Sequence, residues 1–292
     1  MRSAPTPGGR VAYVDGRYLP HAQATVHVED RGLQFADSIY EVCSVIKGML
    51  MEVPGHLDRL ERSLSALGMP LPMPRNALAA VMRETLRRNR LRDGLLYMQV
   101  TRGAYRRDHP IPERARSTLI ITARRLDMSA MERRRAEGIA VVTRPDIRWG
   151  RCDIKTTGLL PNVMAKTEAR KAGAYEVWFV DRDGLVTEGG STNAWIVRKG
   201  TVITRDLKAN ILAGVTRAGV LAAIESAQIA VAERGFTPED AYAADEAFIT
   251  SATGGVIPVV RIDGRDIGTG KPGALTQRIH ALYEAQVEND AP

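Results

Sequence analysis

The chain has 292 residues, a length that favours two domains, and its hydrophobic content is ordinary, with no run of about 20 apolar residues that would span a membrane. Its formal net charge of +7 would suit nucleic acid, but the basic clusters lie in helical patterns without interleaved aromatic residues, so we expect no nucleic-acid partner. Two distant cysteines and scattered histidines argue against a disulfide framework and a metal site, and the first ten residues lack the apolar segment of a secretory signal, so we expect a cytoplasmic protein with free thiols.

The first part of the chain predicts strands with two helices among them. Two short β-rich runs flank Asp15-Gly16, which is a hairpin signal. Leucines recur at helical spacing from Leu57 to Leu67, and Gly68 marks the end of that helix. A second helix is predicted over 74–90, with further strands over 39–48, 94–103 and 117–125. This pattern indicates a small α+β domain over residues 1–125.

The pattern changes after residue 125. A polar, arginine-rich stretch over 126–138 is predicted to be a linker. Beyond it, short strands alternate with helices, which predicts a larger C-terminal domain over 139–292 and an overall α+β or α/β class. The strands are predicted over 139–145, 175–181, 194–200 and 246–251, and the helices over 216–227 and 274–286.

The segment IKTTGLLPNVMAKTEARKAG holds three lysines, which differ in their predicted settings. Pro161 begins a helix and Gly173 ends it, so Lys166 and Lys171 lie on a helix and are expected to be solvated charges. Lys155 precedes that helix in an extended stretch of small and apolar residues. Desolvation would lower the pKa of its amine and make it a nucleophile or a base, although local sequence alone favours an ordinary, non-catalytic lysine.

Three glycine-containing loops follow Lys155 and change its interpretation. Glu188 ends a strand and is followed by two glycines, which allow close approach of a ligand, and a buried carboxylate there would suit a pyridinium nitrogen. Gly214 precedes a predicted helix N-terminus, which suits a phosphate, and ITSATGG is a second strand exit of the same kind. Each loop alone is a weak signal. Together with Lys155 they meet the requirements of pyridoxal phosphate.

These residues carry a resemblance to a known family. The chain resembles class IV aminotransferases, which are fold type IV pyridoxal-phosphate enzymes, and in particular their D-amino acid transaminases, from about Val11 to Tyr283. The motifs stand in the family's order and spacing: EDRGLQFADSIYEV (29–42), HLDRL (56–60), QVTRG (99–103), DIRWGRCDIKTTGLLPNVMAK (146–166), TEGGSTN (187–193), ILAGVTR (211–217) and FITSATG (248–254).

The resemblance implies roles for individual residues around the cofactor, pyridoxal 5′-phosphate. Lys155 matches the lysine that forms the Schiff base, and Glu188 matches the carboxylate paired with the pyridine nitrogen. Arg59 matches a phosphate-binding arginine. The other implied cofactor-binding residues are Val215 and Thr216 at a helix start, Ser251 and Ala252 near the same phosphate, and Ser191 and Leu212 around the ring. Ala252 and Gly190 depart from the family's more hydroxyl-rich loops, so the ring contacts at Gly190 are expected to be looser.

The substrate side of the resemblance points to D-amino acids. Arg107 and His109 form an Arg-x-His pair that, with Tyr40, resembles the carboxylate trap of D-amino acid transaminases. In that family the pair reaches in from the neighbouring subunit, so an active homodimer is implied. The expected reaction moves the amino group of a D-amino acid to a 2-oxo acid, and the expected fold places the cofactor between a small N-terminal domain and a β-barrel-like C-terminal domain with helices.

Other functions are compatible with part of this pattern. A branched-chain L-aminotransferase of the same fold would share Lys155 and Glu188 but lack the Arg-x-His pair. An aminodeoxychorismate lyase or an (R)-amine transaminase uses the same scaffold. A binding protein that has lost its chemistry would have no need of Lys155. Without the resemblance, Arg107 and His109 would be interpreted as parts of a charged surface loop.

Overall fold

A computed structural model describes residues 9–289, which form two compact units. The first unit comprises residues up to Leu126 together with 154–158, and the second comprises 127–153 and the residues from 159 onward. The stretch around Lys155 therefore belongs with the N-terminal unit, whereas the sequence pattern predicts it within the domain 139–292. Most of the first ten residues, in which no secretory signal was expected, lie outside the described part.

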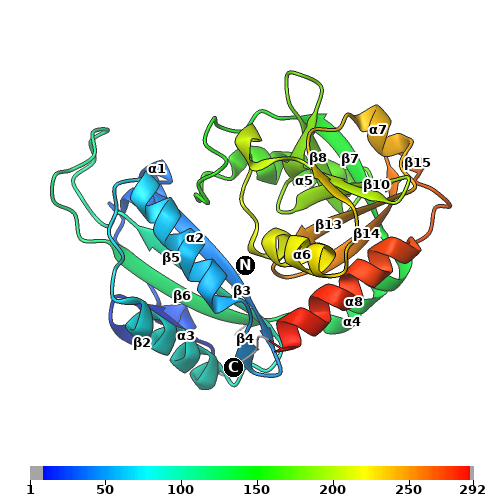
Figure 1. Ribbon diagram of the computed structural model, residues 1–292. Coiled ribbons are helices and arrows are strands. Elements are labelled where there is room, and N and C mark those ends of the chain that lie inside the picture. The colour runs from blue at the N-terminus through cyan, green and yellow to red at the C-terminus, as the bar shows by residue number, and fades with distance from the viewer. Residues whose placement is uncertain (1–8, 290–292) are drawn as a thin grey trace. The chain divides into compact units, whose positions relative to one another are not determined.

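The first unit is built on an antiparallel sheet in the order β2-β1-β6-β5-β3-β4 (Figure 1). The predicted hairpin, strands and two helices are confirmed. The elements are β1 (Val11–Val14), β2 (Arg17–Pro20), a 3-10 turn (His21–Gln23), α1 (Arg31–Phe35), β3 (Ser38–Ile46), β4 (Met49–Leu50), α2 (Val53–Ala66), α3 (Arg75–Asn89), β5 (Gly94–Thr101) and β6 (Thr118–Arg125).

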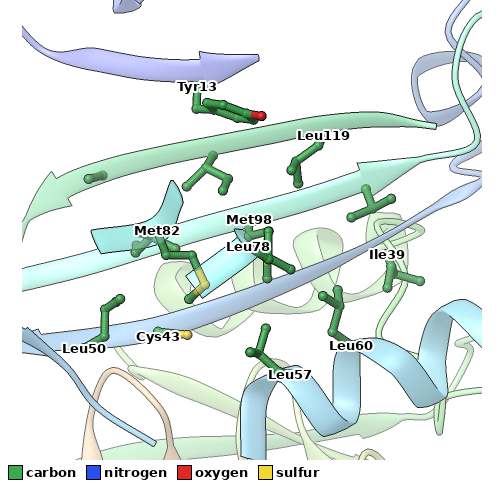
Figure 2. Packing of buried hydrophobic residues seen from close by; sticks show 14 of the residues in the cluster. Tyr13, Ile39, Cys43, Leu50, Leu57, Leu60, Leu78, Met82, Met98 and Leu119 are labelled. Carbon is green, nitrogen blue, oxygen red and sulfur yellow. The ribbon is translucent and has the colours of Figure 1, made fainter. Parts of the chain in front are cut away.

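Helices α2 and α3 bury their apolar stripes against one face of this sheet. Leu57 and Leu60 of α2 and Leu78 and Met82 of α3 join the strand residues in a single core (Figure 2). On β3 every second residue from Ile39 onward is buried, as a two-residue strand period requires. The opposite face of β3 is half-buried, and it carries Tyr40.

The second unit is built on a mixed sheet in the order β12-β11-β10-β13-β14-β7-β8-β9, with β15 paired to β14. Strands β9 and β10 are also in contact, so the sheet curls on itself. The strands are β7 (Ile139–Pro145), β8 (Glu176–Val180), β9 (Val186–Gly189), β10 (Asn193–Arg198), β11 (Thr201–Thr204), β12 (Val231–Glu233), β13 (Glu246–Ser251), β14 (Gly255–Ile262) and β15 (Arg265–Asp266).

Helices cover the outside of this curled sheet. Helices α6 and α8 lie side by side on β13 and β14, and α5 packs on β7 and β8 (Figure 1). The helical elements are α4 (Met128–Glu137), α5 (Leu160–Lys171), a 3-10 turn (Leu207–Ala209), α6 (Val215–Ser226), α7 (Pro238–Tyr242) and α8 (Ala274–Asn289). None of the helices in the described residues is both long enough and apolar enough to cross a membrane.

The stretch 126–138, expected to be a linker, is mostly helical. Asp127 caps α4 by accepting a hydrogen bond from the backbone N–H of Ala130, and Met131 is buried in the core of the second unit. Of the arginines that made the stretch look like a linker, Arg133 is exposed, whereas Arg134 and Arg135 are half-buried, and Arg135 donates to the Gly254 carbonyl at 3.3 Å.

Candidate functional site

Lys155 is placed by backbone hydrogen bonds to elements of the first unit. Its carbonyl accepts the N–H of Tyr40 at 3.0 Å, and its own N–H donates to Ser63 Oγ of α2 at 3.4 Å. The amine Nζ lies 4.2 Å from the centre of the Tyr40 ring, which is a cation–π contact when the amine is protonated. The lysine is thus half-buried against an aromatic face of β3. Lys166 is also half-buried but pairs with Glu176, and Lys171 is exposed.

Tyr40 shares its face of the sheet with Tyr97. Strand pairing places Tyr40 opposite Gln99 on β5, so Tyr97 is a diagonal neighbour, and the two rings stack at 5.6 Å between centroids. Burial, followed by the charge of Tyr40, raises the pKa of Tyr97 to about 12. The Tyr97 hydroxyl is therefore protonated at neutral pH and donates to Gln99 Oε1 at 2.8 Å.

Arg59 lies on α2 and is paired with a buried carboxylate on the other face of β3. Its Nε and Nη2 donate to the two oxygens of Glu41 at 2.8 and 2.7 Å, a bidentate geometry. His56 Nδ1 lies 2.8 Å from Glu41 Oε2. All three side chains are buried. Burial raises the pKa of Glu41, but the hydrogen bonds and charge of Arg59 outweigh it and lower that pKa to about 2.

Arg107 and His109 lie in the loop between β5 and β6, which projects from the sheet of the first unit (Figure 1). Both side chains are exposed, and both lie against Phe35 of α1, with the guanidinium carbon 4.8 Å and the imidazole centre 5.6 Å from the centre of the Phe35 ring. Arg31 holds the loop by donating to the carbonyls of Asp108 and His109 at 2.7 and 3.2 Å. The pair is therefore presented together by a loop with an ordered base.

Glu188 is a buried anion in the second unit, surrounded by hydrogen-bond donors. Arg148 Nη1 donates to Glu188 Oε1 at 2.6 Å. The other oxygen, Oε2, accepts the side-chain amide of Asn193 at 3.3 Å and the backbone N–H of Leu212 at 3.1 Å. Asn193 also donates to the Leu212 carbonyl, so the loop before α6 is tied to the strand end that carries Glu188.

The N-terminus of α6 has the properties of an anion site. Gly214 is its N-cap, and no side chain caps the first N–H groups of the helix within the described residues. Thr216 Oγ1 is buried and has no hydrogen-bond partner among residues 9–289. A Cβ on Gly214 would lie too close to Asn193 Oδ1, so only glycine fits there. A buried hydroxyl without a partner beside an uncapped helix start suits a phosphate group.

Ser251 is the last residue of β13, and Ala252 lies in the turn between β13 and β14. The Ser251 hydroxyl accepts the N–H of Gly254 at 3.2 Å, and the Ser251 carbonyl accepts the same N–H at the same distance. Ala252 is half-buried. The turn is therefore closed on itself by Ser251, while α6 packs against β13.

Ser191 and Lys166 form an unexpected cluster with Glu176, the first residue of β8. Lys166 Nζ donates to Glu176 Oε2 and to Ser191 Oγ, both at 2.9 Å, and Ser191 donates to Glu176 Oε2 at 3.0 Å. The expectation that Lys166 is merely solvated is wrong, because the carboxylate of Glu176 is completely buried and needs a counter-charge. Lys171 is exposed, as expected.

The structure brings some of the expected residues together within each unit. Lys155 lies on Tyr40 in the first unit, and Glu188 is bonded to Leu212 in the second. The sequence analysis missed Arg148, Asn193 and Glu41. For Arg148 and Asn193, the only available signal was that a buried Glu188 requires donors. In the described part of the chain, no group of three or more histidine, cysteine, aspartate or glutamate side chains has an arrangement that would hold a metal ion.

Comparison with known proteins gives consistent matches. The model of the family described as amino-transferase class IV matches residues 38–262. The chain is 38% identical to the D-alanine aminotransferase of Bacillus licheniformis, over 94% of this chain and 95% of that protein. It is 34% identical to the D-alanine aminotransferase of Listeria innocua, with the same coverage of both chains. Among solved structures, the branched-chain aminotransferase of the thermophilic archaeon Thermoproteus uzoniensis with norvaline aligns with a TM-score of 0.84 at 27% identity, covering 97% of this chain and 96% of that one.

Proposed function

This chain belongs to the amino-transferase class IV family, and we propose that it moves the amino group of a D-amino acid, such as D-alanine, to a 2-oxo acid, such as 2-oxoglutarate or pyruvate. The observation that carries the proposal is its similarity to two D-alanine aminotransferases over 94% of its length. The arrangement of Arg107 and His109 on one loop that Arg31 holds by hydrogen bonds supports it, because a guanidinium fork suits a substrate carboxylate.

The cofactor of this reaction is pyridoxal 5′-phosphate, and the residues of each unit suit it. When bound, it supplies a ring that accepts the electrons released when a proton leaves Cα of the amino acid. The Thr216 hydroxyl, unpartnered among the described residues, and the uncapped start of α6 suit its phosphate. The buried anion of Glu188 suits a protonated ring nitrogen. The remaining residues proposed to contact it are Arg59, Ser191, Leu212, Val215, Ser251 and Ala252.

Lys155 is the residue proposed to move the proton. Its amine, once uncharged, takes the proton from Cα of the donor amino acid, which leaves as an oxo acid. In the second half-reaction the same amine delivers a proton to Cα of the product amino acid. Tyr40 covers one side of this amine and, with Arg107 and His109, is proposed to orient the substrate carboxylate. Because the amino group is held by the enzyme between two half-reactions, the kinetics are expected to be ping-pong.

A branched-chain L-aminotransferase is the second candidate, since the solved structure that aligns at TM-score 0.84 is named for that activity. The chain is less similar to that structure, at 27% identity, than to the D-alanine aminotransferase of Bacillus licheniformis, at 38%. This difference and the presence of Arg107 and His109 favour a D-amino acid as the substrate. An aminodeoxychorismate lyase or an (R)-amine transaminase would share the cofactor residues, but the lyase would catalyse a β-elimination and the amine transaminase would take a different substrate. The protein is further proposed to act as a cytoplasmic homodimer, in which Arg107 and His109 serve the site of the partner subunit.

The proposal is tested by the visible absorption spectrum of the purified protein with its cofactor. Adding D-alanine should bleach the band of the lysine-bound cofactor, because the amino group is transferred, whereas L-leucine in a parallel cuvette should leave it. Bleaching by L-leucine alone would establish the branched-chain alternative and contradict the role given to Arg107 and His109.

Lys155→Ala is the matching variant for this experiment. It should show neither the band nor measurable amino transfer, whereas Lys171→Ala, which removes an exposed lysine, should behave like the wild type. Normal turnover by Lys155→Ala would refute the assignment of the proton transfer to Lys155.

A further inference from the structure

We propose that Arg148 is a positioning residue for the cofactor: it acts through Glu188, by holding that carboxylate ionised and oriented toward the pyridine nitrogen. This inference rests on the proposed function. The roles predicted from the sequence include no positively charged partner for Glu188. Arg148 and Glu188 are 40 residues apart along the chain, so the sequence gave no indication that they pair.

Arg148 is held in place from several sides. Its Nη1 donates to Glu188 Oε1 at 2.6 Å, while Nε and Nη2 donate to the two oxygens of Asp146 at 2.9 and 2.7 Å. The guanidinium carbon lies 4.6 Å from the centre of the Phe179 ring. Only 7% of the Arg148 side chain and 6% of the Glu188 side chain are exposed. A guanidinium fixed by two bonds on one side can present its remaining donor to Glu188 in one direction only.

Three hydrogen-bond donors to Glu188 favour its ionised form. Arg148, Asn193 and the backbone N–H of Leu212 are hydrogen-bond donors, and a carboxylate accepts from donors without offering a proton in return. An unpaired carboxylate at this depth would instead take up a proton, since burial disfavours the charged form. A protonated Glu188 would not retain the proton of a pyridinium nitrogen, so the cation of Arg148 determines whether the ring is charged.

Asp146 prevents Arg148 from cancelling the negative charge of Glu188. The three side chains together carry one net negative charge, which attracts a protonated ring. Burial raises the pKa of Asp146, but Arg148 outweighs it and keeps that pKa below its usual value, and Thr187 Oγ1 donates to Asp146 Oδ2 at 2.9 Å. The nearby thiol of Cys152 is uncharged at neutral pH, because burial raises its pKa to about 11.

The test uses two readouts: the dissociation constant of pyridoxal phosphate from the apoenzyme, and the nitrogen chemical shift of bound ¹⁵N-labelled cofactor, which reports whether the ring carries a proton. Arg148→Met should weaken binding by about tenfold to a hundredfold and move the nitrogen shift toward that of an uncharged pyridine. Arg148→Lys keeps the positive charge but not the several N–H donors of the guanidinium. Its dissociation constant and nitrogen shift should lie between those of Arg148→Met and the wild type. Arg151→Met is the control, because Arg151 is exposed and pairs with Asp153; both of its readouts should match the wild type.

A double-variant comparison shows whether Arg148 acts through Glu188. In a Glu188→Gln background, Arg148→Met should cause no further change in the nitrogen shift. If Arg148→Met does not fold, Asp146→Asn replaces it. This variant removes the carboxylate that accepts hydrogen bonds from Nε and Nη2 of Arg148, and it should also weaken the binding of pyridoxal phosphate.

Unchanged affinity and nitrogen shift in Arg148→Met, or in Asp146→Asn where the first variant does not fold, would overturn the inference. An additional shift in the Glu188→Gln background would overturn it as well. A wild-type protein that binds no pyridoxal phosphate would instead refute the proposed function, so the two failures are distinguishable.

Discussion

At the scale of single residues, buried carboxylates decide how the functional side chains are held. Glu41 is on the core-facing side of β3 and is 1% exposed, yet it is ionised because Arg59 donates two hydrogen bonds to it. A buried ion pair of this kind contributes orientation more than stability, but breaking it leaves a charge without a partner. Glu41 therefore determines the direction in which Arg59 is fixed on α2.

The Glu41→Gln variant should reveal this pair through the pH dependence of stability. The pKa of Glu41 is 4.5 in its ordinary setting and about 2 in the fold, so its stabilising contribution is present above pH 4.5 and is lost as the pH falls toward 2. This corresponds to about 3 kcal/mol of unfolding free energy. Urea unfolding should show Glu41→Gln to be less stable than the wild type at pH 6, with the difference narrowing below pH 4.5.

Glu84 provides a matched control for this experiment. Its pKa is also lowered to about 2, by hydrogen bonds from Arg87 and Arg88, but its side chain is 29% exposed at the surface, whereas Glu41 is 1% exposed. Solvent screening should make Glu84→Gln nearly indistinguishable from the wild type in the same titration. A stability difference for Glu41→Gln that is constant from pH 6 to pH 3 would contradict the assignment of the ion pair.

Gly190 is tightly packed by protein atoms, and its expected loosening of the cofactor ring contacts stays a prediction. A Cβ at this position would lie 2.8 Å from Lys166 Cγ, 2.9 Å from Val177 Cγ1 and 3.0 Å from Glu176 Oε1. Gly190→Ala should therefore cost about 1–3 kcal/mol of unfolding free energy, measured in urea. Gly150→Ala is the control, because a Cβ at Gly150 meets nothing within 4 Å and should be nearly neutral. Equal stability of both variants would show that the Gly190 loop relaxes freely.

At the scale of elements, local sequence patterns predicted most of the longer helices but missed α4, whose residues were expected to form a linker, and they predicted the strands only in part. Helix α6 begins where Gly214 and the hydroxyl-bearing first turn indicated a phosphate-type N-terminus. Strand β14 was missed, although it lies between β13 and β7, since Pro258 interrupts its apolar run and proline is uncommon inside a sheet. The structure tolerates Pro258 because it lies one residue before the pairing with β7 begins at Val259.

The start of α6 gives a prediction about the phosphate. Thr216→Val removes a buried hydroxyl that has no partner among the described residues, so the apoenzyme should be as stable as the wild type or up to about 1 kcal/mol more stable. The affinity for pyridoxal phosphate should fall by about tenfold or more, because a hydrogen bond to a charged group is lost. Equilibrium titration of the apoenzyme measures this affinity.

Thr167→Val is the control for the Thr216 variant. Thr167 lies exposed on α5, and its hydroxyl donates to the Val163 carbonyl within the same helix, so its removal should leave cofactor affinity unchanged. If Thr216→Val binds pyridoxal phosphate as tightly as the wild type, the phosphate does not use the start of α6.

At the scale of the whole molecule, the proposed homodimer places Arg107 of one subunit in the active site that contains Lys155 of the other subunit. Arg107→Ala should weaken the binding of amino and oxo acids and leave the cofactor band in place, and Lys155→Ala should be inactive. When the two variants are mixed, unfolded together and refolded, random pairing should restore up to about a quarter of the wild-type activity, because half of the dimers then contain one intact site out of two.

Refolding each variant separately is the control for the mixing experiment. No recovery in the mixture, with sedimentation showing that dimers form, would mean that Arg107 serves the site of its own chain. A monomeric and active wild type would refute the dimer itself.

The sequence by itself determined the local elements and the chemical inventory of this protein. Helical and strand periodicities, turn glycines and helix starts depend on neighbouring residues, so they located Lys155 before a helix, Glu188 at a strand end and Thr216 at a helix start. The tertiary structure decided which partners those groups have. Burial of Glu188 demands donors, but only the fold supplies Arg148, which is 40 residues away along the chain.

The same reason explains the other differences. The sequence predicts a solvated Lys166, but the fold places the buried carboxylate of Glu176 beside it. The stretch around Lys155 belongs to the N-terminal unit, because the N–H of Tyr40 donates a hydrogen bond to the Lys155 carbonyl. Periodicity records which face of an element is apolar, whereas the pairing of buried charges depends on elements that are distant in sequence and adjacent only after folding.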